Sequence, residues 1–479
     1  MSGQKLKRVL GFWPAYGAAV GLVVSGTAMV AVGNVAGSAG KAAFITALIG
    51  LIPMMAAAFA YGELTAMLPG GGMVSDYTMP ALGRFWSVFA ILSGYIMLIA
   101  ADGGTQQVIG GLSMESLTGI PQPIVSAALL IVVVMVNLFG VEFYGKAEAI
   151  LTIFMMVTFG ILGIMGLAGL GESAGATVIN ADVPMISEEA GWAPVFSSVG
   201  IAIWWFIGFE FACPMAEENK KPYKNIPYAL IIGLISIYIM DVIFSTAASK
   251  YTPTDILINS AIPHVEAAGH MLGSTGFLVM TILTIVAAFT TANAEMAALP
   301  RMLYGMAREN LVPSFFGKIH PKYRTPWNGI IFTALLMAAT IIYITANGAD
   351  VGTVLSLIMI ACICWMVSYA IAMIDVLILR KKYPDYPRLW KAPAAAITMP
   401  IGIIGVVYAI YTLTDYLVPA LIAMVLFAAY TGIWLKTKKM KMFEKTPIQN
   451  IAKDILERSE ELPEWDEAVT EWLQAKNNA

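Results

Sequence analysis

IAIWWFIGFEFACPMAEENKKPYKNIPYAL, residues 201–230, is the stretch that decides the fold of this chain. Its first half is a continuous apolar helical pattern, which Gly208 interrupts and in which the ionisable Glu210 follows two residues later. Its second half is a basic loop with two prolines. A carboxylate inside an apolar membrane span is costly, so it usually serves a substrate, ion or proton site that faces protein or water. The stretch therefore predicts a membrane helix with a functional break.

The composition of the whole chain agrees with a membrane protein. Of its 479 residues, 58% are hydrophobic and only 12% are charged, against about 25% charged in soluble proteins. About 20 apolar residues cross a bilayer as a helix. We therefore predict an all-α integral membrane protein with twelve transmembrane helices. Its parts are a cytoplasmic N-terminus at 1–13, a membrane domain at 14–435 and an acidic cytoplasmic tail at 436–479.

The lysines and arginines predict the orientation of these spans. Positive residues near the ends of spans stay on the cytoplasmic side. With twelve spans and a cytoplasmic N-terminus, every Lys and Arg except Lys41 and Lys250 falls on the cytoplasmic side. We therefore expect both termini in the cytoplasm. We place the chain in the plasma (inner) membrane, because no organelle-targeting segment appears in the sequence.

Two spans carry small residues at their middle, where the helix is expected to break. The first contains Val24, Ser25, Gly26 and Thr27, and the sixth contains the sequence around Gly208. Paired breaks in matching positions of two halves indicate an inverted-repeat transporter with its substrate between them. The N-terminus of a half-helix suits an anionic group such as a carboxylate. The alternative is that small residues only allow close helix packing.

This pairing predicts how the membrane domain is organised. One repeat of five helices covers about 14–170, a second of inverted topology covers about 194–379, and two further helices cover about 397–435. In this five-plus-five arrangement, the first and sixth helices are discontinuous.

Three motifs resemble the amino acid, polyamine and organocation (APC) superfamily of transporters, which has the LeuT fold. They are YGELTAMLPGGGMVSDY at Tyr61–Tyr77, the GFE, AEE and NIP segments within 208–227, and RMLYGMARENLVPSFFGKIHPKYRTP at Arg301–Pro326. The resemblance covers residues 14 to about 435. It implies a secondary transporter that carries an amino acid by alternating access.

The resemblance also implies a set of site residues. The substrate would lie between the two breaks, with Trp204 as an aromatic gate and Glu210 as a gating or proton-linked carboxylate. A tryptophan in this position is also ordinary in a membrane helix. The implied substrate-binding residues are Val24, Ser25, Gly26, Thr27, Trp204, Trp205, Ile207 and Gly208.

The sequence departs from the family at two positions. The usual Gly-Ser-Gly of the first span is replaced by Ser25, Gly26 and Thr27, which resembles the variant in permeases for ethanolamine and related amines. In proton-coupled members a lysine in the fifth span occupies a cation site, and Met155 stands there in this chain. A permease for ethanolamine, another small amine or a polyamine is therefore the alternative substrate assignment.

Asp102 is a further candidate for substrate binding. It lies in the third span, and if it faces the cavity it could pair with a substrate ammonium. The alternative is that Asp102 ends its helix at the outer surface, with Gly103 and Gly104 as breakers. The other acidic residues within spans are Asp241, Glu295 and Asp375.

We expect transport either to be coupled to a proton or to proceed by exchange of one substrate for another. Thr290, Thr291 and Asn293 in the eighth span could supply oxygens for Na⁺, which is the less favoured ion. They are equally explained as helix-packing groups.

Enzymatic and metal-binding motifs do not fit this sequence. Its three histidines have no zinc spacing, a Walker A motif is missing, and the GxSxG string at 171–175 lies in an outer loop. We predict no catalytic residues, no metal, no cofactor and no nucleic-acid partner. The expected partners are a small-molecule substrate and membrane lipid.

The tail leaves one class of function open. Residues 443–479 hold nine Asp or Glu and four Lys or Arg, with helical spacing of Ile451 and Ile455 and of Val469, Trp472 and Leu473. The tail is either a solvated segment or a regulatory segment that docks on the inner mouth. A membrane nutrient sensor, which binds an amino acid without transporting it, is the alternative from a different class.

Overall fold

The computed structural model describes residues 7–139, 144–172, 175–180, 183–186 and 188–477, and leaves out the side chains of 144–149 and 477. Over these ranges the regular structure is helical, with a single isolated β-bridge between Leu10 and Asn219. The α-helices are α1 (Phe12–Gly21), α2 (Gly26–Ala39), α3 (Ala43–Met67), α4 (Val74–Ala81), α5 (Arg84–Ile91), α6 (Gly104–Thr118), α7 (Gln122–Phe139), α8 (Tyr144–Leu167), α9 (Ala193–Ser197), α10 (Val199–Ile203), α11 (Pro222–Tyr251), α12 (Thr254–Asn259), α13 (Pro263–Arg308), α14 (Trp327–Asn347), α15 (Val351–Lys382), α16 (Ala395–Thr412), α17 (Thr414–Thr437), α18 (Ile448–Arg458) and α19 (Pro463–Asn477). Shorter 3-10 or π turns are η1 (Gly40–Ala42), η2 (Leu92–Ile96), η3 (Ile99–Gly103), η5 (Trp204–Phe206), η6 (Phe209–Glu217) and η7 (Ser314–Gly317).

Apolar helices long enough to cross a membrane make up most of the chain. Within the described residues there are eleven such segments, and the stretch Gly26–Met67 counts as one of them although it contains α2, η1 and α3. The chain is thus an all-α, multi-pass membrane protein, as its composition predicts. The number of twelve spans and the layout of the repeats stay predictions.

The first predicted break lies between α1 and α2. The chain leaves the helix after Gly21, and Ser25 is extended, with φ −116° and ψ 159°. The Ser25 hydroxyl accepts a hydrogen bond from the Ala28 backbone N–H at 3.1 Å, which satisfies one of the free donors at a helix start. A serine in the middle of an apolar span therefore allows a second helix to begin there.

The second break lies between η5 and η6. Ile207 is extended, with φ −71° and ψ 136°, and Gly208 has φ +109°. This left-handed conformation is open to glycine and costly for residues with a Cβ. The helix pattern around Glu210 is thus interrupted where the sequence predicts.

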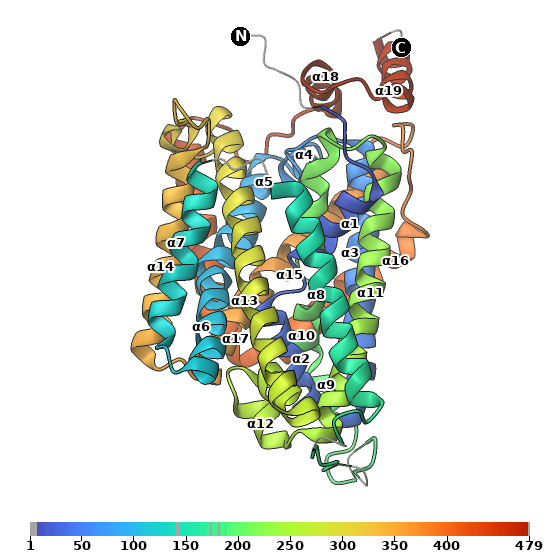
Figure 1. Ribbon diagram of the computed structural model, residues 1–479. Helices are drawn as coiled ribbons and strands as arrows, with labels where there is room; N and C mark the ends of the chain where they lie inside the picture. The colour runs from blue at the N-terminus through green and yellow to red at the C-terminus, as the bar shows by residue number, and fades with distance from the viewer. Residues whose placement is uncertain (1–6, 140–143, 173–174, 181–182, 187, 478–479) are drawn as a thin grey trace.

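The two broken segments pack against each other at the centre of the bundle. On one side of the breaks α1 contacts η6, and on the other side α2 contacts α10 and η5. Figure 1 shows α1 beginning near the end of the bundle where the tail helices α18 and α19 lie, while α9 and α12 lie at the opposite end. The breaks therefore lie midway between the two ends.

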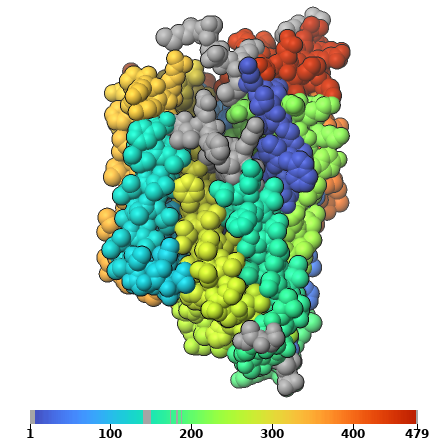
Figure 2. All heavy atoms as spheres, in the orientation of Figure 1, coloured from blue at the N-terminus to red at the C-terminus, as the bar shows by residue number. Residues whose placement is uncertain are grey.

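The outside of the bundle is apolar. Figure 2 shows α7, α13 and α8 side by side on one face. Large exposed side chains on α7 and α8 include Ile131, Met135, Phe154 and Ile161. Such a surface suits lipid tails, and polar groups are kept inside the bundle, which is the arrangement that a bilayer requires.

The tail helices dock on the end of the bundle where α1 starts. The Trp465 indole N–H donates a hydrogen bond to the Met67 carbonyl at 3.0 Å. The Arg8 guanidinium reaches the carbonyls of Ala216 and Glu460. Arg458 lies 3.7 Å from Asp76. Burial raises the pKa of Asp76 to about 7, and the positive charge of Arg458 opposes this rise. The tail therefore packs on the helix bundle rather than extending into solvent.

Candidate functional site

A buried polar cluster lies at the first helix break. The Thr27 hydroxyl accepts hydrogen bonds from the Gln106 side-chain amide at 2.5 Å and from the Trp204 indole N–H at 3.2 Å. The Gln106 carbonyl oxygen in turn accepts from the Thr27 backbone N–H at 3.3 Å. Ser25 and Thr27 hydroxyls lie 3.2 Å apart. The structure thus brings the predicted residues of the first and sixth spans into direct contact.

Asp102 lies beside this cluster, inside a π-helical turn. The turn η3 continues directly into α6, so the helix does not end at Asp102, contrary to the alternative that the sequence left open. Asp102 is buried, and one of its carboxylate oxygens accepts from the Gln106 amide at 2.9 Å. Single π turns are frequent at functional sites because they redirect a side chain. Here the turn points an acid toward the first break.

Glu295 of α13 is the second acid in this region. Its side chain is fully buried, and it interacts electrostatically with Asp102. A Cβ built on Gly103 would lie 2.9 Å from a Glu295 carboxylate oxygen. The glycine therefore allows α13 to approach the π turn closely.

Glu210 is enclosed by three hydrogen-bond donors. Its carboxylate accepts from the Tyr95 hydroxyl at 3.2 Å, the Trp365 indole N–H at 2.7 Å and the Tyr369 hydroxyl at 2.5 Å. The Tyr369 oxygen also accepts from the Gly208 backbone N–H at 3.0 Å. Burial of a carboxylate is tolerated when its oxygens are hydrogen-bonded in this way. Glu210 therefore connects the second break to η2 and α15.

The remaining predicted site residues are buried around the breaks. Val24, Trp205 and Ile207 are at most 4% exposed. A Cβ on Gly26 would lie 3.2 Å from the Gln106 carbonyl oxygen and 3.7 Å from a Thr284 methyl. These residues form the apolar and close-packed walls between the two breaks.

The candidate Na⁺ residues make other contacts. The Thr290 hydroxyl donates to the Val286 carbonyl and lies 3.7 Å from the Met155 sulfur, and the Asn293 oxygen accepts from the Asn137 amide at 2.6 Å. The Thr291 hydroxyl has no hydrogen-bond partner among the described residues. The side chain at position 155, where the family has its lysine, thus lies next to Thr290.

Five residues that contribute to these contacts were not among the predicted site residues. Tyr95, Trp365 and Tyr369 are uncharged and lie in apolar patterns, so nothing in the sequence distinguishes them from packing residues. Gln106 is four residues after Asp102, which places both on one helix face, and this spacing is a signal that could have found it. The sequence identifies Glu295 only as an acid within a span.

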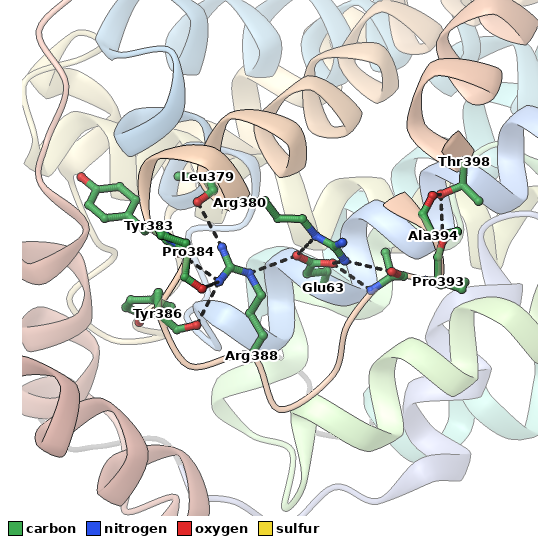
Figure 3. Close-up of polar contacts among 11 residues, drawn as sticks. Glu63, Leu379, Arg380, Tyr383, Pro384, Tyr386, Arg388, Pro393, Ala394 and Thr398 are labelled. Carbon is green, nitrogen blue, oxygen red and sulfur yellow. Dashed lines mark hydrogen bonds and ion pairs between the residues drawn. The ribbon is translucent and has the colours of Figure 1, made fainter. Parts of the chain in front are cut away.

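Away from the breaks, a further buried acid holds the end of the bundle together. Figure 3 shows Glu63 of α3 between two arginines. The Glu63 carboxylate accepts hydrogen bonds from Arg380 Nε at 2.9 Å, from Arg388 Nε at 3.2 Å and from the Ala392 backbone N–H at 2.8 Å. Arg388 also donates to the Leu379, Tyr383, Pro384 and Tyr386 carbonyls. The cluster fixes the loop between α15 and α16 against α3.

This helical core with paired breaks agrees with comparisons to known proteins. The amino acid permease family model matches residues 10–436. The chain belongs to the amino acid permease family. The permease is thus a membrane transporter of the APC superfamily.

The permease resembles characterised transporters over most of its length. It is 25% identical to the branched-chain amino acid permease BcaP of Bacillus subtilis, over 90% of this chain and 94% of that protein. It is 25% identical to the glutamate/serine transporter AimA of Bacillus subtilis, over 76% of this chain and 70% of that protein. It is 24% identical to the chloroplastic cationic amino acid transporter 6 of Arabidopsis thaliana, over 75% of this chain and 66% of that protein.

A solved structure shares the fold. A mutant manganese transporter from Eremococcus coleocola superimposes with a TM-score of 0.60 at 10% identity, over 89% of this chain and 94% of that one. Such a low identity shows the LeuT-like fold alone.

The permease should depend on Gly208. In Gly208→Ala the added methyl group meets the Leu22 side chain, and the φ of +109° is strained for alanine, at a cost of about 1–2 kcal/mol for the conformation alone. We expect a clear loss of transport with reduced folded yield. Gly305→Ala in α13 is the matched control, because its added Cβ meets nothing within 4 Å and its φ is not positive. Equal uptake by both variants would contradict a required break at Gly208.

Proposed function

We propose that this permease carries an amino acid across the plasma membrane by alternating access, with the substrate bound between the two helix breaks. The observation that carries the proposal is the contact of Thr27 with Trp204, which joins the two breaks through one hydroxyl. Backbone N–H groups at a helix start favour an anionic group. At the start of α2 the Thr27 and Ala28 N–H groups are held by the Gln106 and Ser25 side chains, and the substrate carboxylate would take the place of these side-chain oxygens.

The second break plays a different part in the proposed mechanism. The Gly208 N–H is already paired with the Tyr369 hydroxyl. We assign this break to gating, with Glu210 holding it to α15 and Trp204 closing over the substrate. Opening requires these hydrogen bonds to exchange, because irregular backbone at membrane depth cannot be left unpaired.

Coupling and orientation follow from the same residues. Glu210 is the proposed proton-linked group, and exchange without a coupled ion is the other mode. The tail and the basic loops lie on the cytoplasmic side, with both termini inside. A ligand biases the inward and outward states only by its difference in affinity for them, so the substrate contacts must change between states.

The substrate's side chain is not fixed by family membership. The three relatives named above carry branched-chain, acidic or small polar, and cationic amino acids by their names. A small amine stays the second candidate, because Asp102 lies one side chain away from the first break. The choice between an amino acid and a small amine depends on Asp102 and Glu295, the acids near the first break.

Uptake into proteoliposomes tests the proposal. A panel of amino acids and small amines, with and without an inward proton gradient, should show saturable uptake of at least one amino acid. Binding without flux would instead identify a sensor, and would overturn the transport proposal. Uptake restricted to carboxylate-free amines would overturn carboxylate capture at α2.

Thr27→Val should weaken substrate binding. The isosteric change removes the hydroxyl that holds the Gln106 and Trp204 side chains at the proposed binding point, and each hydrogen bond that positions the site is worth about 0.5–1.5 kcal/mol. We expect a rise in KM of roughly tenfold, on the scale of 1.4 kcal/mol per factor of ten. Thr431→Val is the matched control, because that buried hydroxyl donates only to the Phe427 carbonyl of its own helix α17. If the KM of Thr27→Val equals that of the control, Thr27 does not contribute to substrate binding.

A further inference from the structure

Three carboxylate oxygens of Asp102 and Glu295 have no hydrogen-bond partner among the described residues. They are one oxygen of Asp102 and both oxygens of Glu295. Glu295 is 0% exposed and Asp102 is 2% exposed. No lysine, arginine or histidine of the described chain forms an ion pair with either acid. A pair of buried acids with so many unpaired oxygens would be strongly destabilising without a partner.

This acid pair is connected to the first helix break. The Gln106 amide donates both to Asp102 and to the Thr27 hydroxyl, which also accepts from Trp204. Asp102 thus lies within one side chain of the proposed binding point for the substrate carboxylate. A substrate held by its carboxylate at α2 would extend its other end toward the acids.

The chemistry of the partner follows from the unpaired oxygens. A proton shared between the two acids would engage two of these oxygens and leave the third without a donor. A hard metal ion prefers six or more oxygens, and no group of three or more His, Cys, Asp or Glu side chains that could hold a metal occurs in the described residues. A primary ammonium carries three N–H donors, which equals the number of unpaired oxygens, and its single positive charge offsets one of the two negative charges that the acids can carry.

We propose that Asp102 and Glu295 together bind a primary ammonium at the distal end of the substrate. The substrate is then a cationic amino acid with a side-chain amine, or a diamine of similar length. This inference rests on the proposed function, because it takes the helix breaks as the place where the rest of the substrate binds. To the proposed function it adds Glu295 as a substrate-binding residue and a positive charge on the substrate side chain.

Three probes of nearly equal shape test the assignment by proteoliposome uptake. Lysine and norleucine differ by the terminal ammonium, and cadaverine is lysine without its carboxylate. We expect lysine to be carried with a KM at least tenfold below that of norleucine. Asp102→Asn and Glu295→Gln should each remove this preference, measured as the ratio of the lysine KM to the norleucine KM within the same variant.

Asp241→Asn is the matched control, because Asp241 is also a buried acid within a span, on α11. It should keep the preference for lysine. If a variant of the acid pair fails to fold, the thermal stabilisation of the unmodified protein by lysine relative to norleucine gives the same comparison.

The outcomes separate this inference from the proposed function. Norleucine carried as well as lysine, or a preference unchanged in both acid-pair variants, overturns the ammonium site and leaves an amino acid permease. Uptake of no amino acid at all overturns the proposed function. Cadaverine carried as well as lysine supports the ammonium site and identifies carboxylate-free amines as substrates, whereas lysine carried alone supports it with a cationic amino acid.

Discussion

Glu210→Gln is expected to lower the rate of transport about 100-fold. Its carboxylate accepts from Tyr95, Trp365 and Tyr369, and an amide offers only one oxygen. The best placement keeps that oxygen for Tyr95 and Trp365 and turns the amide N–H₂ toward Tyr369, whose hydroxyl proton then loses its acceptor. Lost charge-assisted bonds and one misplaced donor amount to about 3 kcal/mol, which corresponds to roughly 100-fold.

Initial uptake rates in proteoliposomes, normalised to folded protein, measure this effect. Tyr369→Phe is the companion variant. It removes the hydroxyl that links Glu210 to the Gly208 N–H, so it should reduce transport in the same direction while leaving Glu210 its other two donors. Unaltered turnover and unaltered response to a proton gradient in Glu210→Gln would show that this carboxylate is only structural.

The prediction of both helix breaks from sequence succeeded because each one has a local cause. Ser25 caps the start of α2, and Gly208 takes a positive φ, and both are properties of a single residue in an apolar span. The all-helical membrane fold was equally accessible, since hydrophobic length determines it. Local chemistry was therefore enough for the frame of the site.

The partners of the acids could not be predicted in the same way. Glu210 is held by residues from η2 and α15, and Asp102 is near Glu295 of α13. These contacts depend on how helices far apart in sequence pack, and a Tyr or Trp in an apolar span looks like any packing residue. The π turn at Ile99–Gly103 explains why Asp102 was difficult to place: its glycines suggest a helix end, whereas they allow close approach by α13 and α14.

The tail gives an intermediate case. Of its predicted apolar residues, Ile455, Val469, Trp472 and Leu473 are buried and Ile451 is half-buried. The surface against which these apolar residues pack could not be predicted from the sequence of the tail alone. It is set by Trp465, which reaches the Met67 carbonyl, and by Arg8 from the other end of the chain.

Glu63→Ala is expected to destabilise the folded protein on the order of 3–5 kcal/mol, because removing one partner of a buried ion pair leaves the other charge uncompensated. Glu63 is 0% exposed, and the Arg388 side chain that pairs with it is 4% exposed. The variant leaves Arg388 with backbone carbonyls alone and also frees the Ala392 N–H. The loop between α15 and α16 should then detach from α3 at a lower temperature.

Thermal unfolding of the detergent-solubilised protein measures this loss as a lower apparent Tm. Glu444→Ala is the matched control, because Glu444 also pairs with an arginine, Arg84 at 2.9 Å, but its side chain is 48% exposed. Exposed pairs contribute less than about 1 kcal/mol, so this variant should melt close to the unmodified protein. Equal Tm values for the two variants would mean that Glu63 is solvated in the membrane-embedded protein, and that Arg380 and Arg388 hold the loop through their carbonyl contacts.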